Sequence, residues 1–289
     1  MGTICSSIFN KSYVHYSQTD KVVSHPVLKE FLVFQDVITG NLVFGKEINL
    51  NNLKIEDPAR LERHQLFAHA NVIKFEGFKK NDEVNYLALF ESYESTLQQE
   101  IQERCAKNSK FTENEILGVL QSATAALAYF QKKDIFYGQL RPENLVKKGD
   151  EYKLLDMVIF NETKTTYEQI IDGDNEVSHR FLSPELNEVL SNGVASPEYE
   201  KYKQDIYSLG IIILDAMTLN ADASVSISEQ FEKASARYSQ PLLDLVRQIL
   251  DNDVKKRMDA VSCNRIVENM YYGFPISDES DPVNRSLFY

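Results

Sequence analysis

The chain has 289 residues, 43% of them hydrophobic and 26% charged, as in a soluble globular protein with one large domain or one two-lobed domain. Its net charge of −12 argues against a nucleic-acid-binding surface, which needs clustered lysine and arginine. The three cysteines are far apart, which indicates reduced thiols in a cytosolic setting rather than a disulfide framework. No apolar run of about 18 residues is present to predict a membrane span.

The first six residues, MGTICS, fit the N-myristoylation pattern M-G-x-x-x-[ST]. The pattern places a myristoyl chain on Gly2, and Cys5 is positioned for S-palmitoylation as a second anchor. Residues 1 to about 25 lack apolar periodicity, so we expect them to form a tether. We therefore expect a cytoplasmic protein that is peripheral on the cytosolic face of a membrane. The alternative interpretation is a disordered first segment without lipid.

Short apolar runs follow the tether and predict strands. Thr39-Gly40-Asn41 separates the first two runs and is typical of a hairpin turn. Asp57 followed by Pro58 predicts a helix that runs to about Ala68, because aspartate caps helices and proline favours their first position. The predicted strands cover residues 27–37, 41–50, 72–78 and 84–90.

The remainder of the chain has helical periodicity. Thr112 and Glu115 form a capping box at the start of one amphipathic helix. A helix from Asp205 is apolar on nearly every face, which is typical of a helix inside a domain. Strands first and helices afterwards predict an α+β fold with two lobes. Two further helices are expected to begin at Pro241 and after Asp259.

Residues 135–158 read IFYGQLRPENLVKKGDEYKLLDMV. In protein kinases the motif H-R-D-L-x-x-x-N is followed, further along the chain, by D-F-G. The second half of the first motif is present here and ends in Asn144, and Asp156 stands where the second motif starts. The segment resembles the catalytic core of eukaryotic protein kinases, with Tyr137, Gly138 and Gln139 in place of His, Arg and the catalytic Asp.

Further landmarks of the same family occur in the expected order. They resemble the third-strand lysine, the turn after the regulatory helix, the hinge, and the A-P-E, D-x-W-S-x-G and L-x-x-D-P-x-x-R motifs, at residues 40–48, 69–73, 90–93, 183–185, 205–210 and 250–257. The resemblance implies a two-lobed protein-kinase-like fold over residues 26–272. It has a small β-rich N-lobe at 26–92 and a large α-helical C-lobe at 93–272, and residues 273–289 form a polar C-terminal tail.

The resemblance also implies a site for ATP and Mg²⁺ between the lobes. The candidate ligands of the nucleotide are Lys46, Phe90, Glu91, Asn144 and Asp156, and those of the metal are Asn144 and Asp156. The alternatives are a solvated lysine at position 46, and side chains at positions 144 and 156 that only hydrogen-bond to the backbone. Three further residues are implied to be structural, Asp205 as an anchor of the catalytic loop and Glu185 and Arg257 as an ion pair.

The departures from the family pattern concentrate in the reaction machinery. Gln139 carries a neutral amide at the position of the catalytic Asp, and an amide cannot act as a base near pH 7. No glycine-rich motif occurs between residues 27 and 42. Phe44 stands where the family has the alanine that roofs the adenine, so we expect its ring to enter the adenine slot. Arg60 stands where the helix glutamate is expected, and Gly138 replaces the arginine that receives an activation-loop phosphate.

We therefore interpret the chain as a pseudokinase that acts as a membrane-tethered scaffold or allosteric interaction module, with weak or no ATP binding. The alternative is an atypical Ser/Thr protein kinase with weak residual phosphoryl transfer, because Lys46, Asn144 and Asp156 could still position Mg-ATP. A third interpretation is a plain scaffold with a filled cleft. We expect no catalytic residue and no required cofactor. The expected partners are other signalling proteins and the membrane surface, not nucleic acid.

Overall fold

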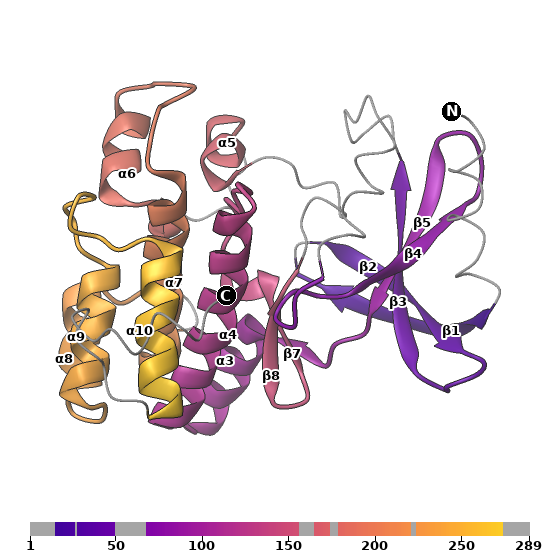
Figure 1. Ribbon diagram of the computed structural model, residues 1–289, viewed down its shortest axis with the longest axis horizontal. Coiled ribbons are helices and arrows are strands. Elements are labelled where there is room, and N and C mark those ends of the chain that lie inside the picture. Colours follow the sequence, from indigo (N-terminus) through magenta and orange to yellow (C-terminus); the bar gives the residue numbers. More distant parts are fainter. Residues whose placement is uncertain are drawn as a thin grey trace, which may run out of the picture.

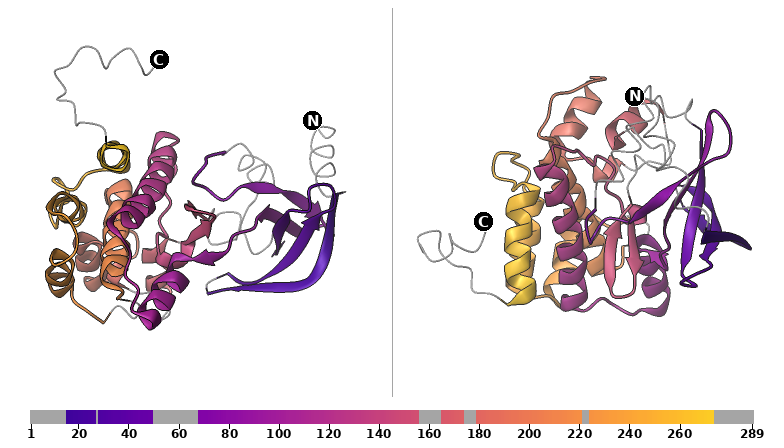
Figure 2. Two further views of the ribbon diagram at one scale, coloured as in Figure 1. Left: turned by 90° about the horizontal axis from the view of Figure 1, so that it is seen from below. Right: turned by 45° about the vertical axis from the view of Figure 1, so that its right-hand side comes forward.

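The computed structural model describes residues 15–26, 28–49, 68–155, 165–173, 179–220 and 224–273. A small lobe built on an antiparallel sheet stands beside a large helical lobe, and three views show the same two-part arrangement (Figures 1 and 2). The α+β, two-lobed fold expected from the sequence is confirmed. None of the helices in the described part of the chain is long and apolar enough to cross a bilayer.

The small lobe contains a five-stranded sheet in the order β1-β2-β3-β5-β4. The turn between β2 and β3 is the predicted hairpin turn, in which Gly40 has a φ of +75° and donates its N–H to the carbonyl of Asp36. The strands are β1 (Tyr16–His25), β2 (Lys29–Asp36), β3 (Leu42–Asn49), β4 (Phe75–Lys80) and β5 (Asn85–Glu91).

The first strand corrects the expected domain boundary. Residues 16–25 were assigned to the tether, but they form β1, which pairs antiparallel with β2 from Tyr16 opposite Asp36 to His25 opposite Lys29. β1 is an edge strand in which His25 alone is buried. Such a strand has no apolar alternation, because both of its faces meet water along most of its length. The predicted helix at 57–68 falls almost entirely outside the described residues.

The large lobe follows a short hinge after β5. Thr112 forms the predicted capping box with Glu115 at the start of α4, and Asp259 caps α10 by accepting a hydrogen bond from the Ser262 N–H. Its main helices are α3 (Leu97–Lys107), α4 (Glu113–Lys132), α5 (Thr166–Ile171), α6 (Pro184–Ser191), α7 (Lys201–Thr218), α8 (Ile227–Ser235), α9 (Gln240–Ile249) and α10 (Ala260–Tyr272). Its small sheet consists of β6 (Ser95–Thr96), β7 (Leu145–Lys148) and β8 (Glu151–Leu154), and its short 3₁₀ helices are η2 (Pro142–Asn144) and η3 (His179–Phe181).

The core of the large lobe surrounds α7, which is buried on nearly all its faces, as its sequence predicted. α4 packs against both α7 and α10, and its buried face runs from Ile116 to Phe130. This core is rigidly packed, and residues 135–144 follow α4 directly and cross to β7, at the border between the lobes (Figure 1). The candidate site lies on this connection.

Candidate functional site

Asp205 of α7 anchors, through backbone hydrogen bonds, the loop that corresponds to the kinase catalytic loop. Its carboxylate accepts hydrogen bonds from the backbone N–H of Gly138 at 2.9 Å and of Tyr137 at 3.3 Å. Burial raises the pKa of Asp205 to about 8. The hydrogen bonds from the two N–H groups favour the ionised form and lower the pKa, but their effect is smaller than that of burial. The resemblance implied this role for Asp205, and the geometry places the side chain where that role requires it.

The backbone conformation and the surroundings of Gly138 leave no room for a side chain. Its φ is +73°, and a Cβ atom would lie 2.8 Å from the Phe136 ring and 3.0 Å from the Thr165 methyl group. A residue with a side chain would be strained in this left-handed conformation and would collide with the ring. The family's arginine therefore does not fit here without a rearrangement of the loop and of the segment that contains Thr165.

Gln139, at the position of the catalytic base, is sealed inside the protein. It is 1% exposed. Its Oε1 accepts a hydrogen bond of 3.1 Å from Nε2 of Gln169, whose own Oε1 accepts one of 3.0 Å from the Arg141 guanidinium. The backbone carbonyl of Gln139 accepts a hydrogen bond of 2.7 Å from Nδ2 of Asn144. A substrate hydroxyl has no access to this position while Gln169 stays in place.

The cover over Gln139 is the short helix α5. Thr165 caps it and forms a capping box with Glu168. The Thr166 N–H donates to the carbonyl of Gly138 at 2.8 Å, and the buried Tyr167 hydroxyl donates to the carbonyl of Val194. This part of the activation segment therefore packs against the loop that contains Gly138 and Gln139. It does not leave that loop open for a peptide substrate to bind.

The ring of Phe44, which was expected to enter the adenine slot, is enclosed by other aromatic side chains. Phe44 is 4% exposed and lies between Phe31, Phe90 and Tyr93, with ring centroids 6.0, 6.0 and 5.1 Å away. The Phe31 ring is stacked and the other two are edge-on, which are favourable arrangements for aromatic pairs. Residues of both lobes complete this cluster, among them Val33 and Ile73 from the small lobe and Val146 and Leu155 from the large lobe. The Phe44 ring accordingly has no free face to offer a nucleotide.

Lys46, the counterpart of the ATP-binding lysine, contacts the small lobe itself. Its Nζ donates to the carbonyls of Leu28 at 2.5 Å and Glu30 at 3.2 Å, and it lies 5.7 Å from the centre of the Phe31 ring. Burial lowers the pKa of Lys46. The sequence left open a phosphate ligand or a solvated strand lysine, and the geometry is a third arrangement in which the ammonium group ties down the β1–β2 hairpin.

His25, which the sequence did not single out, joins the hairpin to the catalytic loop. A backbone N–H can only donate, so the bond of 2.9 Å from the Leu28 N–H makes Nδ1 the acceptor. Nε2 then carries the proton and donates to the carbonyl of Glu143 at 2.9 Å. Burial lowers the pKa of His25 to about 4, so the ring is neutral at pH 7. The hairpin that covers ATP in the family is thus fastened to the opposite lobe.

The remaining predicted ligands are spread over different surroundings. Phe90 is fully buried in the aromatic cluster. The carboxylate of Glu91 pairs with Lys153 at 2.8 Å and faces β8. Asn144 is fully buried and its Oδ1 has no hydrogen-bond partner, which is the one feature here that suits a metal ligand. Asp156 lies outside the described residues, and within them no group of three His, Cys, Asp or Glu side chains could hold a metal ion.

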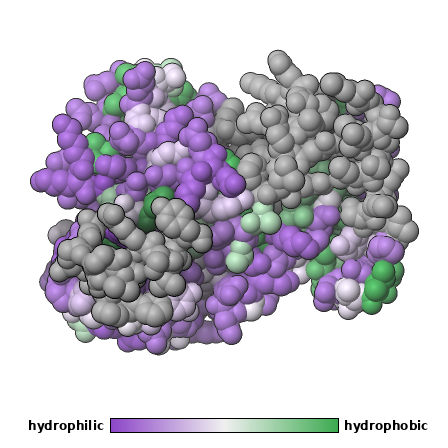
Figure 3. Space-filling view, in the orientation of Figure 1, coloured by the Kyte–Doolittle hydropathy of each residue, from purple (hydrophilic) through white to green (hydrophobic). Residues whose placement is uncertain are grey.

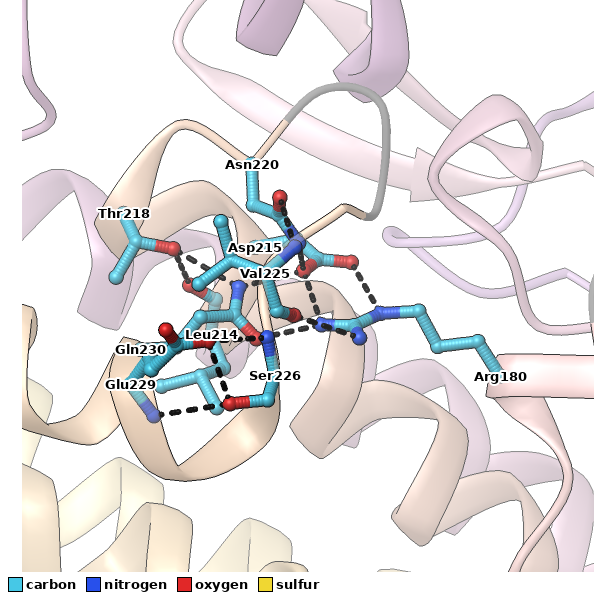
Figure 4. A network of polar contacts seen from close by, with 9 residues as sticks. All are labelled: Arg180, Leu214, Asp215, Thr218, Asn220, Val225, Ser226, Glu229 and Gln230. Atoms are coloured by element: carbon cyan, nitrogen blue, oxygen red, sulfur yellow. Dashed lines mark hydrogen bonds and ion pairs between the residues drawn. The ribbon is translucent and has the colours of Figure 1, made fainter.

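Two ion pairs, each with one buried and one partly buried member, join the end of the activation segment to the helices of the large lobe. Arg257 donates to both carboxylate oxygens of Glu185, at 2.7 and 3.0 Å, the pair that the resemblance implied. Burial is the largest influence and opposes ionisation of Glu185, but the hydrogen bonds from Arg257 and from a backbone N–H, together with the Arg257 charge, outweigh it and leave the pKa lowered. Arg180 of η3 donates to Asp215 at 2.6 Å and to Gln230 at 2.5 Å, between α7 and α8 (Figure 4). The framework of the segment is therefore intact.

The sequence matches the protein kinase domain family over residues 33–271, and the chain belongs to the protein kinase family. It is 25% identical over 271 residues to "Probable serine/threonine-protein kinase nek3" of Dictyostelium discoideum, which is 86% of this chain and 23% of that protein. "Dual specificity protein kinase zak2" of the same organism is 22% identical over 241 residues, 80% of this chain and 34% of that protein. "Serine/threonine-protein kinase PrkC" of Bacillus subtilis (strain 168) is 23% identical over 229 residues, 76% of this chain and 33% of that protein. The chain therefore spans about a quarter to a third of the length of these relatives.

The family generally uses ATP and Mg²⁺, and the residues present do not fit ATP. Phe44, at the position of the alanine that roofs the adenine in the family, is enclosed in the aromatic cluster, Lys46 donates to backbone carbonyls, and the hairpin turn between β1 and β2 contains no glycine. The unpaired Oδ1 of Asn144 would hold a metal ion that neutralises phosphate charge, and it does not offset these three features, because that role requires a bound nucleotide.

Proposed function

We propose that this member of the protein kinase family is a pseudokinase, a scaffold or allosteric interaction module with weak or no ATP binding. The observation that carries the proposal is the buried Gln139, which stands at the base position beneath Gln169 of α5. Loss of a general base alone slows proton transfer by roughly 10²–10⁴-fold, and the cover adds the free energy of moving α5 away. The partners that the module would contact are other signalling proteins.

An atypical Ser/Thr kinase with weak residual activity is the second candidate. The buried and unpaired Oδ1 of Asn144 favours it, because that oxygen is available to a metal ion. Phosphoryl transfer also depends mainly on positioning and electrostatics, so a missing base is not by itself fatal. Against it stand the engaged ammonium group of Lys46 and the enclosed ring of Phe44. These two features remove positioning as well, which leaves the second candidate without its main source of rate.

A radiolabel assay separates the two candidates. Purified protein is incubated with γ-labelled ATP, Mg²⁺ or Mn²⁺ and generic protein substrates, beside Lys46→Ala and Gln139→Asp variants. The pseudokinase proposal expects no transfer by the parent above the level of Lys46→Ala. It also expects none from Gln139→Asp, because restoring the carboxylate restores neither access nor the nucleotide site. Transfer by the parent that disappears in Lys46→Ala would overturn the proposal in favour of the weak kinase.

The module is further proposed to be tethered to the cytosolic face of a membrane by lipids on Gly2 and Cys5. The support is the pattern MGTICS, which lies outside the described residues. A single myristoyl chain binds bilayers only marginally, so Gly2→Ala should release the protein and Cys5→Ser should leave it weakly bound. Cell fractionation and mass spectrometry of the N-terminal peptide test this. A fully soluble parent with an unmodified Gly2 would end the tether proposal and leave the pseudokinase proposal standing.

A further inference from the structure

The turn between β2 and β3 exposes two large aliphatic side chains. Val37 is 63% exposed and Ile38 is 70% exposed, and Leu42 at the start of β3 is 42% exposed. The space-filling view shows hydrophobic residues at this edge of the small lobe, at its lower right (Figure 3). No charged residue occurs from 37 to 42. We call these three residues the apolar turn.

The apolar turn is held in a fixed shape. Oδ1 of Asp36 accepts hydrogen bonds from the N–H groups of Ile38 and Thr39, at 2.8 and 3.1 Å. Gln35 donates to the carbonyl of Gly40 at 3.1 Å. The hydrogen bonds from Ile38 and Thr39 hold the Asp36 carboxylate toward the backbone and lower its pKa. The side chains of Val37 and Ile38 are therefore presented to the surroundings at little further cost in conformational entropy.

The same turn lies where the N-terminal segment joins the sheet. The Val37 N–H donates to the carbonyl of His15 at 2.7 Å, and Tyr16 pairs with Asp36. His15 lies thirteen positions after Gly2, so a lipid on Gly2 lies within about 45 Å of this turn along the chain, whatever path the segment takes. A lipid anchor of that length keeps the apolar turn at a high effective concentration next to the bilayer.

From these contacts we propose that the apolar turn is a bilayer-docking surface that inserts Val37 and Ile38 into the interface of the membrane to which the N-terminus is tethered. The inference rests on the proposed lipid tether. Two protruding aliphatic side chains, beside an Asp36 carboxylate that accepts hydrogen bonds from the backbone of the turn, suit the boundary between headgroups and acyl chains. A second copy of the chain suits the turn less, because each copy has a net charge of −12. For the same reason the docking uses neutral rather than anionic lipid.

A single-tryptophan reporter tests the docking directly, because the natural chain contains no tryptophan. An Ile38→Trp variant of the full, myristoylated chain is mixed with phosphatidylcholine vesicles, with and without brominated acyl chains. A Val194→Trp variant is the matched control, since Val194 is 41% exposed on the large lobe. We expect a blue shift and bromine quenching at position 38, none at position 194, and no strengthening when phosphatidylserine is added.

Each contrary outcome has a distinct meaning. If the myristoylated protein binds vesicles but the reporter at position 38 stays in water, the docking surface is wrong and the tether stands. If Gly2 of the expressed chain is found unmodified and neither vesicle binding nor a blue shift occurs, the lipid tether and the docking surface are both wrong. A blue shift that grows with protein concentration without vesicles would assign the turn to a second copy of the chain and overturn docking.

A double variant, Val37→Ser with Ile38→Ser, measures the contribution of the turn without a reporter. The vesicle partition coefficient of the myristoylated protein should fall by roughly tenfold or more, because each aliphatic side chain withdrawn from water favours the bound state. Thermal unfolding should be unchanged, since both side chains are exposed. An unchanged partition coefficient would contradict the proposal.

Discussion

Replacing Phe44 by alanine should weaken the fold and open the nucleotide slot at the same time. The ring is enclosed by three other aromatic rings and by aliphatic side chains from both lobes. Truncating a buried phenylalanine costs about 3–5 kcal/mol, because apolar contacts are lost and a cavity remains. For a chain of this size that corresponds to a fall in the unfolding midpoint of roughly 6–20 °C.

The nucleotide response provides the sharper readout. The parent protein should bind ATP in the millimolar range or not at all, so its unfolding midpoint should move little with Mg-ATP or Mn-ATP. A ligand at ten times its Kd stabilises the folded state by about 1.4 kcal/mol, which a thermal-shift assay resolves. The Phe44→Ala variant should gain a midpoint shift with ATP that the parent lacks, since the cavity lies where adenine would bind.

The control for this experiment is Phe78→Ala. Phe78 is a fully buried phenylalanine of the same sheet, on β4, but it does not belong to the aromatic cluster at the border of the lobes. Its truncation should lower the midpoint similarly and bring no ATP response. A parent protein that binds ATP tightly, with Phe44→Ala binding no better, would refute the assignment of Phe44 to the adenine slot.

Three further predictions concern the framework around the slot. Arg257→Ala should cost about 3 kcal/mol, the lower end for a broken buried pair because Glu185 stays partly solvated, and an unchanged urea midpoint would contradict it. The folded pKa of His25, about 4, lies below its ordinary 6.5, so its contribution is complete above pH 6.5 and is lost as the pH falls to 4. That loss is roughly 3 kcal/mol. Between pH 7 and pH 4 the free energy of unfolding, measured with urea, should fall by about this much less in His25→Gln than in the parent. Parallel pH curves for the two proteins would refute the prediction. Gln139→Asp should increase proteolysis within 165–173, because the side chain is one methylene shorter than that of Gln139 and places a charge at a position that is 1% exposed, and an unchanged cleavage rate would argue against the cover.

Local sequence rules predicted much of the fold. The hairpin turn around Gly40, the capping box of Thr112 and the cap at Asp259 depend on a few neighbouring residues, and each is present in the structure. The capping rule also reveals a signal that the sequence interpretation did not use. Thr165 and Glu168 have the spacing of a capping box, and they begin α5, the helix that covers Gln139.

The sequence could not predict the partners of these elements. β1 was missed because an edge strand with one buried residue has no period to detect. The bond between Gln169 and Gln139 joins residues 30 positions apart, and the bond between His25 and Glu143 joins residues 118 apart. Hydrophobic periodicity carries information about which face of an element is buried, not about which distant side chain it meets. Lys46 illustrates this limit, since its position in the strand was evident and its acceptors were not.

The substitutions in the catalytic loop and the cover over it are consistent with each other. Burying a carboxylate without a partner costs far more than burying an amide that is hydrogen-bonded. An Asp at position 139 would carry a buried charge beneath the cover that Gln169 provides, whereas the amide of Gln139 is neutral and accepts a hydrogen bond from Gln169. Gly138 contributes in the same way, because a side chain there would collide with Thr165 at the start of α5. The residues at positions 138 and 139 and the closure by α5 are thus structurally linked, and Asp205 holds the same loop to α7.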